Sequence, residues 1–375
     1  MRFRGLQSNT LKRVAIVALT AALLLGLTGS AAALPAIPKI KKANANAITG
    51  KFTVSGIRIV GPDGKTFTPR GVNKGGLEWL KKGYDETFWN YQRIKSWGAN
   101  VIRIPVSPAF GLKRMCTYDK DYLKRVDRIV RWGEQLKMLV ILDNHVSTQG
   151  RTCGTDRWYG PQKAPDIHSL DFVKQLATRY KNRTWTAIDL YNEPHDIPDS
   201  IWRNGGIVDG WRAVGMQQML DAVRATGNKN LVLATGNLWG NDLRMIVNTP
   251  LYNDKNVVYA AHSYPFWCNR VVYYNEPYVC NGKQIPPHLD GQIAPAIGRR
   301  PVILAEFGTQ RSIPGEMQAP IDWAEAHHIG WIAWLWGNGK MTDFCLLDAN
   351  GNPSVSGKPV HDALKRATAS AKKKK

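Results

Sequence analysis

Two stretches of this 375-residue chain place a glutamate at the end of a mainly apolar run. In one, residues 187–191 lead to Glu193, which Pro194 follows; in the other, residues 302–305 lead directly to Glu306. Pro194 lacks a backbone N–H and disfavours a helical conformation at Glu193, so strand pairing should end there and the carboxylate should project. Either glutamate alone could mark an ordinary exit from a strand. Two carboxylates facing each other, one protonated and one charged, instead suit hydrolysis of a glycosidic bond.

The spacing of apolar runs predicts the scaffold that holds these glutamates. Eight short apolar runs alternate with helical patterns, which indicates parallel strands joined by helical crossovers. At this length, eight such units fit an α/β fold of the closed (β/α)₈ TIM barrel type, and a doubly wound open sheet is the alternative. The Gly-x-Gly-x-x-Gly turn of dinucleotide-binding open sheets is missing from the sequence. The barrel strands are expected at 70–73, 101–105, 139–142, 187–191, 231–234, 257–261, 302–305 and 331–334.

Helical periodicity and turn residues complete the expected order of elements. An N-terminal β-hairpin should precede the barrel, with arms at 52–60 and 65–69 around the turn Pro62–Gly64. Short helical segments are expected near Leu243 and Ile293. The longer helices are expected at 85–97, 122–136, 170–180, 208–224, 321–327 and 360–367.

The carboxyl ends of all barrel strands open onto one face, where the active sites of such barrels lie. The residues expected at these ends are polar and aromatic: Asn73, Glu78, Trp79, Arg103, His145, Asn192, Glu193, His262, Tyr264, Glu306 and Trp334. Tryptophan also outnumbers phenylalanine in the chain, 14 to 9, and large rings suit stacking against pyranose rings. The sequence contains no cofactor fingerprint, no Cys-x-x-Cys spacing and no His-Glu-x-x-His motif, so we expect neither a cofactor nor a metal.

Taken in order along seven strand ends, these residues resemble the active-site set of glycoside hydrolase family 5. The matching motifs are Asn192-Glu193-Pro194-His195, Ala305-Glu306-Phe307-Gly308, Arg103, His145, the His262-x-Tyr264 pair and Trp334. The resemblance spans about residues 71–337 and implies a retaining (β/α)₈ glycosidase of the cellulase type. Asp196 departs from the pattern, because many members have glycine after the first motif, and this leaves the subfamily open.

The resemblance implies two catalytic residues, Glu193 as the general acid/base and Glu306 as the nucleophile. Asn192 would hydrogen-bond the 2-hydroxyl of the sugar being cleaved. Tyr264 and Arg103 would hold the carboxylate of Glu306, the first by donating a hydrogen bond and the second by its charge. A structural ion pair beneath the sheet is the alternative for Arg103.

The same resemblance assigns three further residues to substrate binding. His145 and His262 would contact sugar hydroxyls or the acid/base, and Trp334 would form the floor beneath the scissile sugar. Histidines packed in a core with satisfied hydrogen bonds are the alternative for His145 and His262. His195 is expected to support the site rather than to take part in the reaction.

The N-terminus reads as a targeting segment rather than as part of the fold. A basic start, an apolar run at 14–27 and small residues at 30–33 predict a signal peptide over residues 1–33, with cleavage as late as residue 47. An uncleaved anchor is the alternative, but the run is shorter than the about 18 residues that span a membrane. A linker is expected at 34–50, the catalytic domain at 51–368 and a basic tail at 369–375. We expect a secreted protein with no stable membrane insertion after processing.

Half of the formal net charge of +22 lies in seven basic residues within 1–47 and four within 372–375. The remaining basic residues are scattered over helical segments instead of being clustered with aromatic residues. This distribution argues against a nucleic-acid partner and leaves attraction to an anionic wall or polymer open. We expect a monomer whose partner is a polysaccharide substrate.

Five cysteines in an exported chain predict up to two disulfides and one cysteine left over. We expect Cys116 to pair with Cys153 and Cys268 with Cys280, because all four lie in loop-like segments. Cys345 is then the cysteine left over. Spacing alone does not fix this connectivity.

The functional expectation is a secreted, retaining endo-β-1,4-glucanase of the cellulase type that hydrolyses β-linked polysaccharide by double displacement. A β-mannanase or another β-glycanase of the same family is the nearest alternative, because loops rather than the fold decide the substrate. An alternative from a different class is a non-catalytic protein that binds carbohydrate or a cell wall. The presence of both carboxylates with their apparent partners argues against that class, since binding alone does not need them.

Overall fold

The computed structural model describes residues 50–153, 162–251, 254–264, 278–280, 283–285, 288–310, 314–338 and 343–373. The expected signal peptide, most of the expected linker and the end of the basic tail lie outside these ranges. Among the described helices, none combines the length and the apolar character that crossing a membrane requires.

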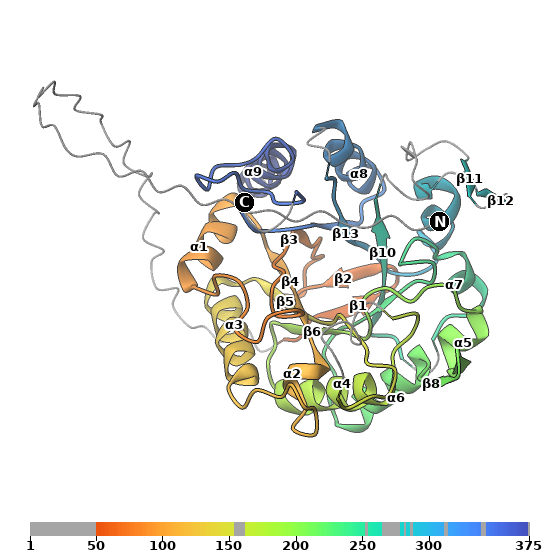
Figure 1. The fold of residues 1–375 in the computed structure, drawn as a ribbon. Coiled ribbons are helices and arrows are strands. Elements are labelled where there is room, and N and C mark those ends of the chain that lie inside the picture. The colour runs from red at the N-terminus through yellow and green to blue at the C-terminus, as the bar shows by residue number, and fades with distance from the viewer. Residues whose placement is uncertain are drawn as a thin grey trace, which may run out of the picture. The chain divides into compact units, whose positions relative to one another are not determined.

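Within the described residues, eight parallel strands close into a barrel, with helices around its outside (Figure 1). The strand order around the ring is β10-β13-β14-β3-β4-β5-β6-β9. Each strand overlaps the position predicted for it, and the (β/α)₈ TIM barrel is confirmed. The strands are β3 (Arg70–Asn73), β4 (Val101–Val106), β5 (Leu139–Asn144), β6 (Thr186–Asp189), β9 (Val232–Thr235), β10 (Val257–Ser263), β13 (Val302–Phe307) and β14 (Gly330–Ala333).

Alternate residues of the barrel strands point inward and fill the interior. In β5, Ile141 belongs to the buried cluster inside the barrel, whereas its neighbour Leu142 packs in the outer cluster with the helices. Asp143 lies two positions beyond Ile141, so its side chain points inward as well. The equivalent steps in β4 and β6 bring Arg103 and Asp189 inward. A charged layer therefore lies above the apolar interior, at the carboxyl ends of the strands.

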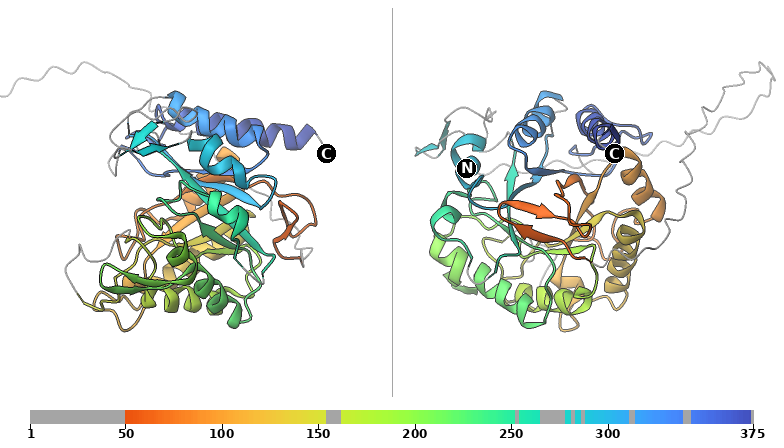
Figure 2. Two further views of the ribbon diagram at one scale, coloured as in Figure 1. Left: turned by 90° about the vertical axis from the view of Figure 1, so that its right-hand side faces the viewer. Right: turned by 180° about the vertical axis from the view of Figure 1, so that it is seen from behind.

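A two-stranded antiparallel sheet, β1 (Thr53–Ser55) and β2 (Arg58–Val60), lies across the opposite end of the barrel (Figure 2). Phe52, just before β1, joins the buried cluster inside the barrel. The N-terminal hairpin is thus confirmed, but both of its strands lie within the predicted first arm, and the predicted second arm pairs with it only through an isolated antiparallel bridge between Val60 and Thr66. The chain turns back at Gly56, whose φ is 61°, and the predicted second arm 65–69 lies outside both strands. The turn at Gly56 was not predicted, because apolar residues alternate with other residues on both sides of it.

The helices pack around the barrel through one apolar face each. Helix α3 (Tyr122–Leu136) has the predicted bounds, and Gly133 lets it approach β5, because a Cβ there would lie 2.2 Å from a methyl carbon of Val140. The other helices are α1 (Phe88–Trp97), α2 (Pro108–Gly111), α4 (Ile167–Tyr180), α5 (Asp199–Asn204), α6 (Met216–Ala225), α7 (Arg244–Asn248), α8 (Pro314–Ala326) and α9 (Gly357–Lys373). The remaining short elements are η2 (His288–Ile293), η3 (Ala294–Ala296), β11 (Tyr278–Cys280) and β12 (Lys283–Ile285).

The predicted helix 208–224 is wrong over nearly its first half, residues 208–215. Strands β7 (Gly206–Val208) and β8 (Trp211–Ala213) form an antiparallel hairpin there, and helix α6 begins only after it. The hairpin turns at Asp209-Gly210, where both residues have positive φ. An Asp-Gly pair favours this conformation in a two-residue turn, and the helical prediction overlooked it.

A disulfide joins Cys116 to Cys153, as predicted, with the two Cα atoms 5.2 Å apart. It links the loop after β4 to the loop after β5. The second predicted pair involves Cys268, which lies outside the described residues. Cys345 is buried.

Candidate active site

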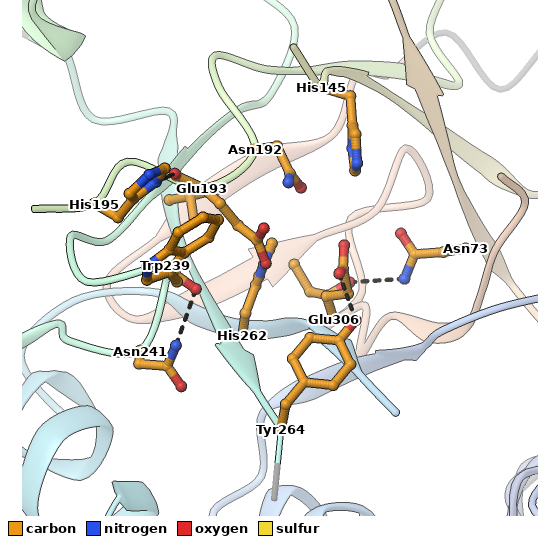
Figure 3. A network of polar contacts seen from close by, with 12 residues as sticks. Asn73, His145, Asn192, Glu193, His195, Trp239, Asn241, His262, Tyr264 and Glu306 are labelled. Carbon is orange, nitrogen blue, oxygen red and sulfur yellow. Dashed lines mark hydrogen bonds and ion pairs between the residues drawn. The ribbon is translucent and has the colours of Figure 1, made fainter. Parts of the chain in front are cut away.

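Polar side chains from several strand ends meet at one mouth of the barrel (Figure 3). Glu306 lies within β13, and Glu193 follows β6 just after Asn192, whose N–H donates to the carbonyl of Asn144 in β5. A register shift in β10 immediately before His262 sets that residue opposite Glu306. Such irregularities in a strand re-aim a side chain next to an active site.

The two glutamates face each other across this mouth. One carboxylate oxygen of Glu193, one of Glu306 and one ring nitrogen of His262 all lie within 4.8 Å of one another. Retaining glycosidases hold their carboxyl groups about 5–5.5 Å apart, whereas inverting ones need about 6.5–9.5 Å to admit a water. The separation therefore fits direct attack by one carboxylate. The same three residues have the spacing that could hold a metal ion, although His262 Nδ1 already contacts Glu193 Oε1 at 2.9 Å.

Glu306 is held from two sides by hydrogen-bond donors. Arg103 Nη1 donates to its Oε2 at 2.9 Å, and the Tyr264 hydroxyl donates to its Oε1. Only 4% of the residue is exposed. These contacts fix the orientation of the carboxylate, and the guanidinium stabilises a negative charge on it.

Arg103 is fully buried at the centre of the charged layer. Besides Glu306, its guanidinium contacts Asp189 Oδ2 at 3.0 Å, Asn73 Oδ1 at 3.1 Å, Asn192 Oδ1 at 2.9 Å and Asp143 Oδ1 at 3.1 Å. Burial alone would lower the pKa of Arg103, but the three surrounding carboxylates outweigh burial and raise it, so the guanidinium stays charged. For the acidic Asp189, burial has the opposite effect and raises the pKa, while the charge of Arg103 acts to lower it.

Glu193 has different surroundings from Glu306. Its side chain is 16% exposed and touches the ring of His262 rather than a cation. Burial raises the pKa of Glu193 to about 7, although the positive charges of His145 and Arg103 act in the opposite direction. At neutral pH this carboxyl is therefore divided between its protonated and ionised forms, as a group that first donates and then accepts a proton requires.

His262 is buried behind Glu193 and lacks a charge at neutral pH, because burial lowers its pKa to about 4. A neutral ring that contacts an ionised carboxylate must donate to it, so we assign the proton to Nδ1. The loop after β9 closes behind this ring. A Cβ on Gly240, whose φ is 75°, would lie 2.9 Å from the Cγ of His262.

His145 forms the opposite wall of the mouth. Its Nδ1 lies 2.6 Å from Asp143 Oδ2. Burial would lower the pKa of His145, but the Asp143 carboxylate outweighs burial and raises it to about 9, so the ring is cationic at neutral pH. The ring lies parallel to Trp334, with centroids 5.7 Å apart, and Trp79 meets its edge at 6.4 Å.

His195 supports the segment that carries Glu193. Its Nδ1 contacts the backbone carbonyl of Glu193 at 2.8 Å, and its ring stacks on Trp239 with centroids 3.4 Å apart. The next residue, Asp196, has a φ of 51°. This left-handed conformation favours glycine and is tolerated by Asp, which explains how an aspartate occupies the position.

The sequence profile described as Cellulase (glycosyl hydrolase family 5) matches residues 60–340. This chain belongs to glycoside hydrolase family 5. Among relatives of this family 5 enzyme, Cellulase CelDZ1 of Thermoanaerobacterium sp is 23% identical, over 77% of this chain and 70% of that protein. A mannan endo-1,4-beta-mannosidase of Salipaludibacillus agaradhaerens is 22% identical, over 79% of this chain and 84% of that protein.

Solved structures show the same fold. The beta-glucanase SdGluc5_26A from Saccharophagus degradans has a TM-score of 0.67 and 21% identity, and the match covers 85% of this chain and 94% of that one. The chain is thus a glycoside hydrolase of the β-glycanase kind, with endoglucanases and mannanases among its distant relatives. Membership of the family decides against a non-catalytic binding protein.

In this family 5 barrel, every residue predicted for the site lies at the same mouth. These residues are Arg103, His145, Asn192, Glu193, His262, Tyr264, Glu306 and Trp334. The sequence analysis assigned no role in the site to Asp143, Asp189 or Trp239. The two aspartates could have been found from the inward step of two residues along each strand. Trp239 could not, because it lies in a loop whose path the sequence does not indicate.

Proposed function

We propose that this protein is a secreted, retaining endo-β-1,4-glucanase with Glu306 as nucleophile and Glu193 as general acid/base. The observation that carries this proposal is the pair of carboxylates within 4.8 Å, one held by a guanidinium and the other with a pKa of about 7. Two solved structures of similar fold support a glucan: SdGluc5_26A is known with cellotetraose and XacCel5A with cellopentaose.

In the first step, Glu193 in its protonated form donates its proton to the glycosidic oxygen while Glu306 attacks the anomeric carbon. The bond to the leaving sugar breaks and a glycosyl–Glu306 ester forms. Arg103 pairs with the Glu306 carboxylate before attack and keeps it oriented toward the carbon. The Tyr264 hydroxyl stabilises the same carboxylate from the other side.

In the second step, Glu193 is ionised and removes a proton from a water that enters where the leaving sugar was. The water attacks the anomeric carbon, Glu306 leaves, and the product keeps its β configuration. His262 donates to the ionised form of Glu193 throughout this step. Asn192 accepts from Arg103 through Oδ1, which leaves its amide N–H groups to bind the 2-hydroxyl.

The substrate panel that tests this proposal contains soluble β-1,4-glucan, mixed-linkage glucan, mannan and xylan. Release of reducing ends from β-1,4-glucan, with a rapid fall in viscosity, is the expected result for internal cleavage. NMR of the first product should show the β anomer. Initial formation of the α anomer, or no hydrolysis of any polymer, would contradict the mechanism.

A β-mannanase is the second candidate. Relatives described as mannan endo-1,4-beta-mannosidases match about as much of this chain as the cellulase does. A higher kcat/KM on mannan than on glucan in the same panel would favour it. The roles of the two glutamates are the same in both candidates.

Secretion is part of the proposal. It is supported by the signal-like pattern of residues 1–33 and by the Cys116–Cys153 disulfide, since disulfides persist mainly outside the reducing cytosol. N-terminal sequencing of protein from the culture medium should give a start between residues 34 and 48. Retention of the full chain in the cytosol would contradict it.

A further inference from the structure

A groove of about 470 Å³ opens beside the catalytic mouth, a volume within the range of ordinary ligand sites. Its lining residues come from the loops after β3 and β4, which are neighbours in the barrel: Trp79, Leu80, Lys81, Lys82, Gly83, Phe110 and Thr117. Both loops follow the carboxyl ends of their strands. The groove therefore lies on the same face of the barrel as the two glutamates.

Trp79 connects the groove to the catalytic mouth. Its ring is 44% exposed in the groove and meets the edge of His145, which in turn lies parallel to Trp334. The mouth has Trp239 on the side of Glu193 and His145 on the other side (Figure 3). Because Glu193 protonates the leaving oxygen, the leaving sugars extend past it, and the groove lies on the side of the sugars that form the glycosyl ester.

Lys81 and Lys82 place two positive charges at the groove. Both side chains are exposed, and neither ammonium forms an ion pair with a residue that the structure describes. Of the acidic groups near these lysines, Glu86 pairs with Lys74 at 3.1 Å and Asp119 pairs with Arg125 at 2.7 Å, while the exposed Asp85 accepts a hydrogen bond from the Asn90 amide. An anion entering the groove would therefore meet two exposed cations that form no ion pair within the described residues.

The walls of the groove are held in place before any ligand arrives. Arg125 Nη1 donates to the carbonyl of Lys81 at 3.1 Å on one side. On the other side, Thr117 donates to the carbonyl of Ala109 at 2.7 Å, next to the Cys116–Cys153 disulfide. A preformed site loses less conformational entropy on binding than one that must order itself.

We propose that this groove binds sugar units that carry a carboxylate, so that the preferred polymer is an acid-bearing β-glucan rather than a neutral one. Trp79 would pack against the face of a pyranose ring, and Lys81 and Lys82 would pair with its carboxylate. The inference rests on the proposed function for the direction of the chain through the site. Surface ion pairs are weak, so reversing two charges should change the preference by roughly three- to tenfold.

The test compares two soluble polymers with the same β-1,4-glucan backbone, carboxymethyl cellulose and hydroxyethyl cellulose. The variants are the double substitution Lys81→Glu/Lys82→Glu and a matched control, Lys174→Glu/Lys229→Glu. The control changes the net charge equally at exposed positions outside the groove, on α4 and before β9. The ratio of kcat/KM for the anionic polymer to kcat/KM for the neutral one should fall roughly three- to tenfold in the first variant and stay constant in the control.

An equal fall in both double variants would show that bulk charge, not the groove, attracts the anionic polymer. An unchanged ratio in Lys81→Glu/Lys82→Glu would overturn the proposal directly. Retardation of the Glu306→Ala variant in gels containing each polymer measures binding without turnover, with and without the two lysine substitutions. If the parent hydrolyses neither polymer, the proposed function fails, while the difference in gel retardation still decides whether the groove selects the carboxylate.

Discussion

Glu306 and Glu193 lie within 4.8 Å of each other, yet their surroundings differ in charge. Glu306 belongs to a strand and is held by Arg103 and Tyr264. Glu193 lies beyond the end of its strand, and its carboxylate contacts the neutral ring of His262. A cation on one side and desolvation on the other divide two identical side chains into a charged nucleophile and a protonated acid. The assignment of roles thus follows from the environment rather than from the residue type.

Removing the carboxylate of Glu306 should have the largest effect. In Glu306→Ala, kcat on β-1,4-glucan should fall by about 10⁴- to 10⁶-fold, because the covalent step is lost. Azide added with an aryl cellobioside that has a good leaving group should restore turnover and give the α-glycosyl azide. Formation of the β-glycosyl azide would instead show that Glu306 is the acid/base and Glu193 the nucleophile.

Substitution of Glu193 should have a smaller and pH-dependent effect. Since the acid must be protonated and its pKa is about 7, kcat/KM of the parent should fall as the pH rises above about 7. In Glu193→Ala, activity on polymer should drop by about 10²- to 10⁴-fold and this alkaline limb should disappear. Azide should here give the β-glycosyl azide. If kcat/KM of Glu193→Ala still fell above about pH 7, a group other than Glu193 would cause that fall.

Arg103→Lys tests the ion pair that holds the Glu306 carboxylate. Lysine keeps the positive charge but lacks the planar guanidinium whose several N–H groups donate to different acceptors. The value of kcat should therefore fall by about 10²-fold. The buried acceptors left unpaired should also lower the free energy of unfolding. Arg179→Lys is the matched control, because Arg179 pairs with Asp127 on the surface. Equal losses of activity in both variants would contradict a special role for Arg103.

The raised pKa of Glu193 should also appear in stability. The folded chain holds this proton to about pH 7, whereas the unfolded chain releases it near the ordinary value of 4.5. The stability supplied by the proton is therefore complete below pH 4.5 and is lost as the pH rises through 7. Glu193→Gln should exceed the parent by up to about 3 kcal/mol in free energy of unfolding above neutral pH, with no such gain in acid.

Urea unfolding followed by tryptophan fluorescence measures this difference across the pH range. Asp322→Asn removes an exposed carboxylate from the outside of α8 and serves as the control for the loss of one negative charge. If the curves for Glu193→Gln and the parent ran parallel, the carboxyl of Glu193 would titrate at its ordinary pKa.

The barrel and its catalytic pair could be predicted because they depend on local patterns. Buried parallel strands read as apolar runs, and Pro194 marks where one of them ends. The hairpin at Asp209-Gly210 was missed because apolar spacing was given more weight than a two-residue turn. Where local signals disagree, the turn chemistry was the better guide.

The supporting charges were harder to predict than the reacting ones. Asp143 and Asp189 become visible only once the inward face of each strand is known, because they meet Arg103 across the barrel interior. Trp239 meets His195 through a loop with two positive φ angles, at Leu238 and Trp239. The contact between Trp239 and His195 leaves no periodic signal in the sequence. Both sets of contacts depend on how distant segments are brought together.

Covalent trapping tests the central claim most directly. A 2-deoxy-2-fluoro-β-cellobioside with a good leaving group should form the first ester and slow its hydrolysis, so that intact-protein mass spectrometry shows one added glycosyl group. Peptide mapping should place that group on Glu306, with none formed in Glu306→Ala. A label on Glu193, or turnover that yields the α product without any label, would contradict the account.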